Sequence, residues 1–259
     1  MIDYWHSGFQ NSGKAVHSSD YWISLTETMN QIMAHETKAI GSAAQLCGDA
    51  IAQGGVVHVF GTGHSSHQAA DTFYRAGGLA CVNAILEPFL SIGGGALLST
   101  WMERQPGLAS LILDRYDLNA GEPMIVFSVS GVNSVPVEVA TESRSRGLPV
   151  IAITSRSYCR AVAEARGVAR TLITEADLVI DNHVPIGDAV LPIPQSNFRA
   201  GSISTIAASL IYHLLLEQIL QHLAQRDVGV PIFASSNLPN AQAHNAELIA
   251  RYRKRVRNF

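Results

Sequence analysis

The sequence predicts an α/β protein built on a parallel five-stranded sheet, and three observations lead to this prediction. Short apolar runs rich in valine and isoleucine, typical of strands buried on both faces, alternate with longer stretches of helical periodicity. The segments between successive runs are long enough for the helical crossovers that parallel strands require. No change of composition and no linker divides the chain, so a single domain is expected over residues 1–259.

The alternation of these stretches places each element in turn. Strands are expected over residues 56–60, 79–86, 124–128, 149–154 and 178–181. Helices are expected over residues 19–53 with a break near His35, 68–75 with a stop at Gly77-Gly78, 108–116, 135–146, 202–224 and 241–256. Three prolines predict an irregular segment over 182–197, and residues 1–18 are polar and irregular as well. The core, residues 54–225, is therefore flanked by an N-terminal helical extension (1–53) and by a C-terminal tail and helix (226–259).

The loop after the first strand has the composition of an anion-binding turn. Its sequence is Gly-Thr-Gly-His-Ser-Ser over residues 61–66, and the glycines allow a sharp turn with close backbone approach. The following helix offers free N–H groups and the positive end of its dipole to an anion, and two serine hydroxyls can donate to the same anion. Gly63, Ser65 and Ser66 are therefore candidate phosphate ligands, although glycine turns also close strands for purely structural reasons.

A second loop repeats this composition after the strand at 124–128. Small polar residues lead into the next helix, with Ser134 expected as its N-cap. The candidate phosphate or substrate ligands here are Ser128, Ser130, Gly131, Asn133 and Ser134. Two hydroxyl-rich loops, each between a strand and a helix, predict a phosphate cradle shared by two strand ends.

Composition excludes several classes of protein. Hydrophobic residues make up 47% of the chain, charged residues 15%, and the formal net charge is −3. This charge gives no field that would attract nucleic acid or an anionic membrane, so neither partner is expected. No apolar run approaches the ~20 residues of a membrane span, and the N-terminus lacks the pattern of a signal peptide. Three widely separated cysteines fit a reducing cytoplasm.

Motifs along the chain together resemble the sugar isomerase (SIS) domain family. They lie at residues 61–65, 73–79, 128–134, 149–155, 181–182, 187–189 and 235–239. The wider pattern, from about residue 23 onward, is similar to single-domain SIS proteins of the phosphoheptose isomerase and phosphosugar-binding type. The resemblance implies a flavodoxin-like three-layer sandwich with the strand order 2-1-3-4-5. Both serine loops then flank the point where the strand order reverses, which is where ligands bind in such sheets.

The resemblance also adds candidates for substrate contact. In SIS enzymes the start of the helix expected at 202–224 faces the sugar, which implies contacts from Ser202, Ser204 and Thr205; helix capping by Ser202 is the alternative. A histidine can reach the site from a neighbouring subunit, which implies a role for His244. SIS proteins commonly build their sites at subunit interfaces, so a homo-oligomer, dimer or tetramer, is expected.

Two residues are candidates for chemistry. Aldose–ketose isomerisation of a phosphosugar needs a base that moves a proton between C1 and C2. Glu87, after the second strand, is expected to be this base, and a solvated turn residue is the alternative. His64 is expected to bind substrate or to shuttle a proton, unless it braces the loop. His64 and His67 lack a third ligand, so neither a metal nor another cofactor is expected. His58, inside a strand, is expected to be a hydrogen-bonded core residue.

The sequence thus predicts a protein that binds a phosphorylated sugar and isomerises it through an enediol. Two alternatives remain open: a non-catalytic phosphosugar-sensing module, and a lyase or etherase acting on an amino-sugar phosphate. Relatives that cleave ethers carry a carboxylate near the position of Arg75, which counts against the lyase. A nucleotide-binding Rossmann protein is disfavoured, because the first loop lacks the third glycine of the dinucleotide motif.

Overall fold

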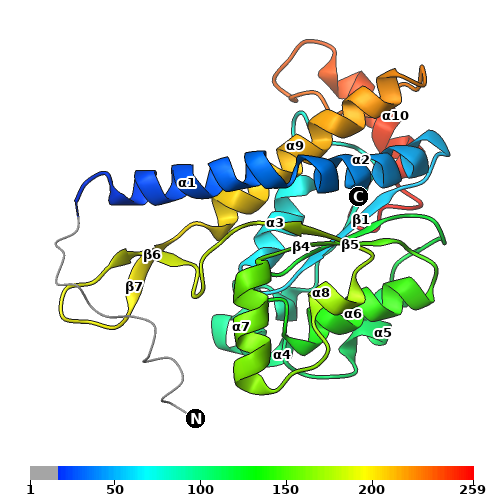
Figure 1. Ribbon diagram of the computed structural model, residues 1–259. Coiled ribbons are helices and arrows are strands. Elements are labelled where there is room, and N and C mark those ends of the chain that lie inside the picture. The colour runs from blue at the N-terminus through cyan, green and yellow to red at the C-terminus, as the bar shows by residue number, and fades with distance from the viewer. Residues whose placement is uncertain (1–16) are drawn as a thin grey trace.

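A sheet of five parallel strands lies at the centre of the computed structural model, which describes residues 17–259 (Figure 1). The strand order is β2-β1-β3-β4-β5, which confirms the predicted fold class and order. The strands are β1 (Val57–Gly61), β2 (Val82–Ile85), β3 (Met124–Phe127), β4 (Val150–Thr154) and β5 (Leu178–Asp181). The expected irregular segment over residues 1–18 lies almost wholly outside the described residues.

Helices cover both faces of the sheet and enclose two separate cores (Figure 1). Ile125 and Phe127 of β3 belong to the first core, and Met124 and Val126 to the second, because successive side chains of a strand point to opposite faces. The helices on the first face are α2 (Thr37–Ala52), α3 (Ser65–Thr72) and α9 (Ser204–Ala224). Those on the second face are α5 (Leu108–Leu113), α6 (Ser134–Ser145) and α8 (Leu172–Glu175). The result is the expected three-layer sandwich.

The N-terminal extension consists of two helices, α1 (Asp20–His35) and α2, as the break predicted near His35 requires. Glu36 lies at the break and is buried. Its carboxylate accepts hydrogen bonds from the N–H of Asp181 at 3.0 Å and from Nε2 of His183 at 3.1 Å. The break is therefore fastened to the end of β5, while α1 projects beyond the sheet (Figure 1).

Several expected elements differ in extent, and two of these differences have a clear cause. The helix of the first loop ends at Thr72 and not at Gly77-Gly78, because Phe73 is extended and Tyr74 has a positive φ of 46°. The second strand is shorter than predicted, because its first part pairs elsewhere. The N–H of Ala80 donates to the carbonyl of Pro231 at 2.7 Å, so this segment joins the C-terminal part of the chain.

The prediction of an irregular segment over 182–197 is wrong at residues 189–192, which form a strand, whereas residues 182–188 and 193–197 contain no helix or strand. β6 (Ala189–Pro192) pairs antiparallel with β7 (Arg199–Ser202) in a two-stranded hairpin. Pro192 lies opposite Arg199 at the end of this pairing. A two-stranded ribbon leaves one side of each strand without ladder bonds, so a proline fits there.

The remaining helices lie in crossovers and at the C-terminal end. They are α4 (Ala96–Met102), α7 (Arg156–Arg166) and α10 (Ala241–Tyr252), with short 3-10 helices at Pro88–Leu90 and Ile92–Gly94. Sequence patterns left the segments of α4 and α7 unassigned. Within residues 17–259, no helix combines the length and the hydropathy that crossing a membrane requires.

Candidate functional site

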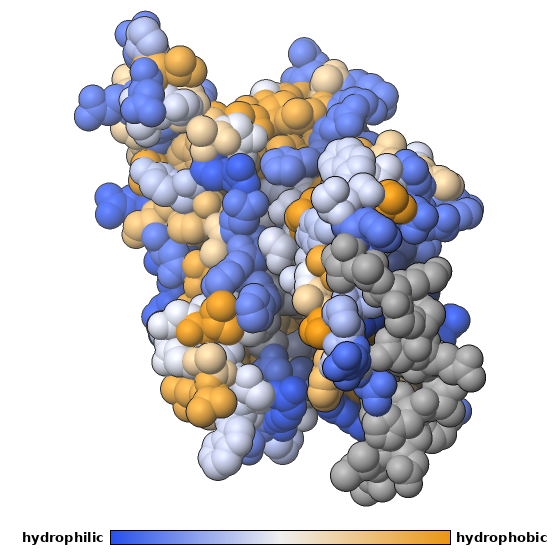
Figure 2. Space-filling model, turned by 90° about the vertical axis from the view of Figure 1, so that its left-hand side faces the viewer, coloured by the Kyte–Doolittle hydropathy of each residue, from blue (hydrophilic) through white to orange (hydrophobic). Residues whose placement is uncertain are grey.

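A cavity of about 450 Å³ opens at the carboxyl ends of the strands, between the loops that follow β1 and β3. These strands are neighbours in the sheet and the chain order reverses between them, as at ligand sites in other open α/β sheets. Figure 2 looks onto this end of the molecule and shows its surface hollowed between two lobes. The loop after β5, α4 and the start of α9 complete the walls.

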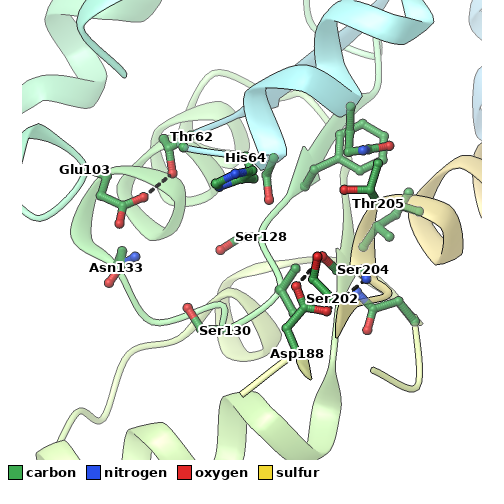
Figure 3. Close-up of a pocket in the computed structure, with 18 of the residues that line it drawn as sticks. Thr62, His64, Glu103, Ser128, Ser130, Asn133, Asp188, Ser202, Ser204 and Thr205 are labelled. Carbon is green, nitrogen blue, oxygen red and sulfur yellow. Dashed lines mark hydrogen bonds between the residues drawn. The ribbon is translucent and has the colours of Figure 1, made fainter. Parts of the chain in front are cut away.

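Most of the predicted binding residues line this cavity (Figure 3). They are Gly63, His64 and Ser65 of the first loop, Ser128, Ser130 and Asn133 of the second, and Ser202, Ser204 and Thr205 before and within α9. In Figure 3, Ser128 and Ser130 lie between Glu103 and Asn133 on one side and Asp188 on the other. Residues from three distant parts of the chain therefore meet at one place.

The first loop forms the expected sharp turn. Two of its N–H groups donate hydrogen bonds within the loop, so they are not free to bind an anion. A Cβ at Gly61 would lie 2.2 Å from the carbonyl oxygen of Ser65, so only glycine allows the strand to approach the helix this closely. The N–H of Ser65 donates to Thr62 at 2.9 Å, and that of Ser66 to Gly63 at 3.3 Å. The hydroxyl of Ser66 also donates to the carbonyl of Gly63, at 2.7 Å, outside the cavity. The first loop thus offers the hydroxyl of Ser65 rather than a set of free N–H groups.

The second loop keeps more of its donors available. The backbone N–H groups of Ser130, Val132 and Asn133, and the hydroxyl of Ser130, have no hydrogen-bond partner among residues 17–259. Gly131 has a positive φ of 59°, and its N–H donates to Oγ of Ser128 at 3.2 Å, so it shapes the loop without lining the cavity. This loop is the richer source of donors for an anion.

The prediction for Ser134 needs a correction. Ser134 is the first residue of α6, and Asn133, in extended conformation, occupies the N-cap position. The hydroxyl of Ser134 donates to the carbonyl of Arg104 at 3.0 Å, and Ser134 does not line the cavity. Its role in the structure is to join α6 to the end of α4.

Glu87 lies outside the cavity that the serines form. It is 4% exposed, and its carboxylate is bonded to the guanidinium of Arg115 and accepts a hydrogen bond from the hydroxyl of Tyr116 at 3.2 Å. Burial, followed by the negative charge of Glu87, raises the pKa of Tyr116 to about 12. Glu87 faces a second cavity of about 310 Å³, together with Ser66 and His67. The geometry therefore does not bring the expected base to the expected phosphate ligands, because a neighbouring arginine and tyrosine hold it elsewhere.

Asp188 organises the start of α9. Its Oδ1 accepts hydrogen bonds from the N–H groups of Ile203 at 3.1 Å and Ser204 at 2.9 Å, and its Oδ2 from the hydroxyl of Ser204 at 2.6 Å. Asp188, and not Ser202, therefore caps this helix. Ser202 lines the cavity, and its carbonyl accepts a hydrogen bond from the Tyr21 hydroxyl of α1 at 2.7 Å.

The histidines occupy different surroundings. His64 lines the cavity, and its ring lies 6.1 Å from that of His67, centroid to centroid. Nε2 of His244, in α10, donates to the carbonyl of Ile232 at 2.8 Å, and His244 does not line the cavity of its own chain. In the described part of the chain, no three His, Cys, Asp or Glu side chains are grouped as a metal site would need.

One cavity residue, Glu103, was missed by the sequence patterns. It follows α4, and its Oε2 accepts a hydrogen bond from the Thr62 hydroxyl at 2.8 Å, while Oε1 pairs with Nη1 of Arg104 at 2.8 Å. The signal in the sequence was the spacing of Ala96, Thr100 and Glu103, which places all three on one face of a helix. The three glycines at 93–95 directly before it made this segment resemble a flexible loop.

The charge of the cavity is carried by acids. Among the described residues 17–259, Glu103 and Asp188 are the carboxylates that line it, and none of its lining residues is a lysine or an arginine. An anion in this cavity would therefore be held by hydroxyl and N–H donors rather than by a cationic side chain. Its negative charge would have to lie away from the two carboxylates.

Comparison with known proteins agrees with the fold and the position of the cavity. The family model for the SIS domain matches residues 20–155 of this chain. The chain belongs to the SIS domain family. The matched part of this SIS protein contains both serine loops, α4 and Glu103.

Two relatives are similar to this chain over more than nine tenths of its length. The SIS protein is 39% identical to the UPF0309 protein TTE0306 of Caldanaerobacter subterraneus subsp. tengcongensis, over 92% of this chain and 98% of that protein. It is 37% identical to a UPF0309 protein of Brucella anthropi, over 91% of this chain and 96% of the relative.

Solved structures share the fold at low identity. One is the phosphoheptose isomerase GmhA from Neisseria gonorrhoeae, with a TM-score of 0.51 and 16% identity, covering 76% of this chain and 94% of that one. Another is the Vibrio vulnificus NanR protein complexed with ManNAc-6P, with a TM-score of 0.50 and 13% identity, covering 93% of this chain and 71% of that one.

Proposed function

We propose that this SIS protein binds a sugar phosphate in the 450 Å³ cavity, with the phosphoryl group between Ser65 and the second loop. The observation that carries the proposal is the set of unused donors at this place. The hydroxyls of Ser65 and Ser130 and the N–H groups of Ser130, Val132 and Asn133 have no hydrogen-bond partner among the described residues. Phosphate oxygens are strong acceptors that match such donors at the start of a helix.

The comparisons support the same class of ligand. The structural relatives include a phosphoheptose isomerase and a protein complexed with ManNAc-6P. A cavity of about 450 Å³ also has the size of a small-molecule site. Gly63, Ser128, Ser202 and Ser204 are proposed to contact the ligand from the cavity walls, while Ser66, Gly131 and Ser134 support the loops.

Aldose–ketose isomerisation through an enediol is the activity we infer for the site. It requires one group that moves a proton between C1 and C2, and a second group that donates a proton to the oxygen on C1 and accepts one from the oxygen on C2. His64 belongs to the first loop, lines the cavity and is proposed for the second role. A sensing module without turnover is the second candidate, because the unused donors can hold a phosphoryl group whether or not the sugar reacts, and NanR, which shares the fold, is complexed with ManNAc-6P.

A binding test decides the first part of the proposal. Wild type and a Ser65→Ala, Ser130→Ala double variant are compared by thermal shift with a panel of sugar phosphates. A ligand at 100 times its Kd stabilises the wild type by about 2.7 kcal/mol, and we expect the double variant to lose most of this shift. Ser42→Ala, an exposed serine of α2, is the matched control and keeps it. An unchanged shift in the double variant would place the ligand elsewhere.

The oligomeric state and the cellular location of the protein belong to the same proposal. We expect a single-domain homo-oligomer, a dimer or a tetramer, in which His244 of a neighbouring copy reaches the site. A cytoplasmic location fits the three free, buried cysteines.

A further inference from the structure

Of the two carboxylates among the described residues of the cavity, Glu103 is the one with both oxygens open to a further donor. Asp188 accepts two hydrogen bonds at Oδ1 and one at Oδ2 from the start of α9, so Oδ1 has no lone pair left and the carboxylate is held as the cap of that helix. Glu103 accepts one hydrogen bond at each oxygen, from Thr62 and from Arg104. Each carboxylate oxygen has two lone pairs, so each oxygen of Glu103 can accept one more proton donor.

Three hydrogen bonds hold Glu103 in place, two to its backbone and one to its side chain. Its N–H donates to the carbonyl of Ser99 within α4, at 3.0 Å. Its carbonyl accepts the N–H of Val135, in the first turn of α6, at 3.0 Å. Thr62, which holds its side chain, belongs to the turn after β1. The elements that carry the two serine loops therefore also set the position of this carboxylate, as a reacting group requires.

We propose that Glu103, and not Glu87, is the carboxylate that transfers the substrate proton. This inference rests on the proposed function, since it assigns a role at the same site. Glu87 is enclosed by Arg115 and Tyr116 and faces another cavity. Glu103 lines the phosphosugar cavity together with His64 (Figure 3).

The proton transfer balances without an external oxidant or reductant. The Glu103 carboxylate takes the proton from C2 of the open-chain aldose phosphate, and the C–H electron pair forms the C1=C2 bond. The electrons of the C1 carbonyl move to O1, which takes a proton from the His64 ring. The Glu103 carboxyl then returns its proton to C1 while the O2 proton passes to His64, and the carbonyl forms at C2.

Exchange of substrate C–H protons with D₂O tests this assignment. A panel of sugar phosphates is used because the substrate is not identified. The full chain is incubated in D₂O with glucose 6-phosphate, glucosamine 6-phosphate, N-acetylmannosamine 6-phosphate and sedoheptulose 7-phosphate. Exchange at C1 or C2 is followed by NMR, and Kd is measured separately. We expect wild type to exchange at least one probe, and Glu103→Gln to slow that exchange about 100-fold or more with its Kd unchanged. Glu87→Gln is the competing variant and should keep the exchange.

A second variant separates chemistry from structure. Glu103→Asp keeps a carboxylate one methylene shorter, so it should recover part of the exchange that Glu103→Gln loses if the charge itself is needed. Loss of exchange in Glu87→Gln with retention in Glu103→Gln overturns the inference, as does equal exchange in all variants. A wild type that binds a probe but exchanges none overturns it and leaves phosphosugar binding intact. Absence of binding by every probe overturns both proposals.

Discussion

Glu122 lies near the start of β1, at the opposite end of the strand from the cavity. Its carboxylate is the centre of a buried hydrogen-bond network. Its carboxylate accepts hydrogen bonds from Nε2 of His58 at 3.0 Å, from the N–H of Val56 at 3.0 Å and from Nη2 of Arg255 at 2.7 Å. Nδ1 of His58 accepts a further hydrogen bond from Asn83 at 3.2 Å, so the expectation of a hydrogen-bonded core histidine is confirmed. Burial alone raises the pKa of Glu122, but these donors outweigh it and lower the pKa to about 2.

This pKa predicts an acid-sensitive stability. Because the folded protein holds the pKa of Glu122 below its ordinary value of 4.5, ionised Glu122 stabilises the fold above that pH. The contribution, on the order of 3 kcal/mol, is lost as the pH falls from about 4.5 toward about 2. Urea unfolding of wild type across this range measures it. Glu122→Gln is expected to be less stable at neutral pH and to show a flatter pH dependence, and an identical slope would contradict the assignment.

At the scale of elements, the cavity depends on how α9 begins. Asp188, with a positive φ of 63°, connects the β6–β7 hairpin to the first N–H groups of α9. It replaces the serine cap that the sequence suggested and holds Ser204 at the cavity wall. A side-chain acceptor at a helix start is worth about 1 kcal/mol, so this contact affects stability as well as the shape of the site.

Substitution of Asp188 is expected to show both effects. Asp188→Ala loses the cap and places a less suitable residue at positive φ, so the free energy of unfolding should fall by about 1–2 kcal/mol. Asp188→Asn keeps a side-chain oxygen and tolerates this backbone, so it should lose less. Chemical denaturation measures the difference, and phosphosugar affinity should weaken in the same order. Equal losses in the two variants would contradict this order, and the absence of any loss would mean that the cap does not contribute to stability.

At the scale of the whole molecule, apolar side chains remain uncovered on one side of the helical layer. On α1, Trp22 is 67% exposed and Met33 is 52% exposed. Met33 also lines a groove of about 360 Å³ with Ile40 and Leu214, between the N-terminal helices and α9. Exposed apolar groups of this kind are typical of surfaces that bind other proteins, which agrees with the proposed homo-oligomer.

The oligomer prediction is tested by sedimentation at micromolar concentration. We expect the wild type to sediment as a dimer or larger, and a Met33→Glu, Leu214→Glu variant to dissociate, because unpaired charges would be buried at the contact. Gln53→Glu adds a charge at an exposed residue after α2 and serves as the control. A wild type that sediments as a monomer, or a double variant that stays associated, would contradict this use of the surface.

Much of the fold and half of the site were accessible from sequence patterns. The strand runs and the serine loops are local features, since burial on both faces selects valine and isoleucine, and a strand-to-helix turn selects glycine and serine. The order in which the strands pair came from resemblance to a family, and the structure confirms it. The exact ends of α3 and β2 depended on long-range pairing with residues near 231–233, which no local pattern records.

The sequence by itself determined the α/β class, the strands and the two hydroxyl-rich turns, because these follow from side-chain burial and backbone freedom within a few residues. Only the tertiary structure decided which carboxylate faces the cavity. Glu87 and Glu103 both follow the second strand, but Arg115 and Tyr116 hold the first away, whereas Thr62 and the start of α6 hold the second inside. Those partners lie far apart in the chain, so only the packing of the elements around the sheet brings them to one carboxylate or the other.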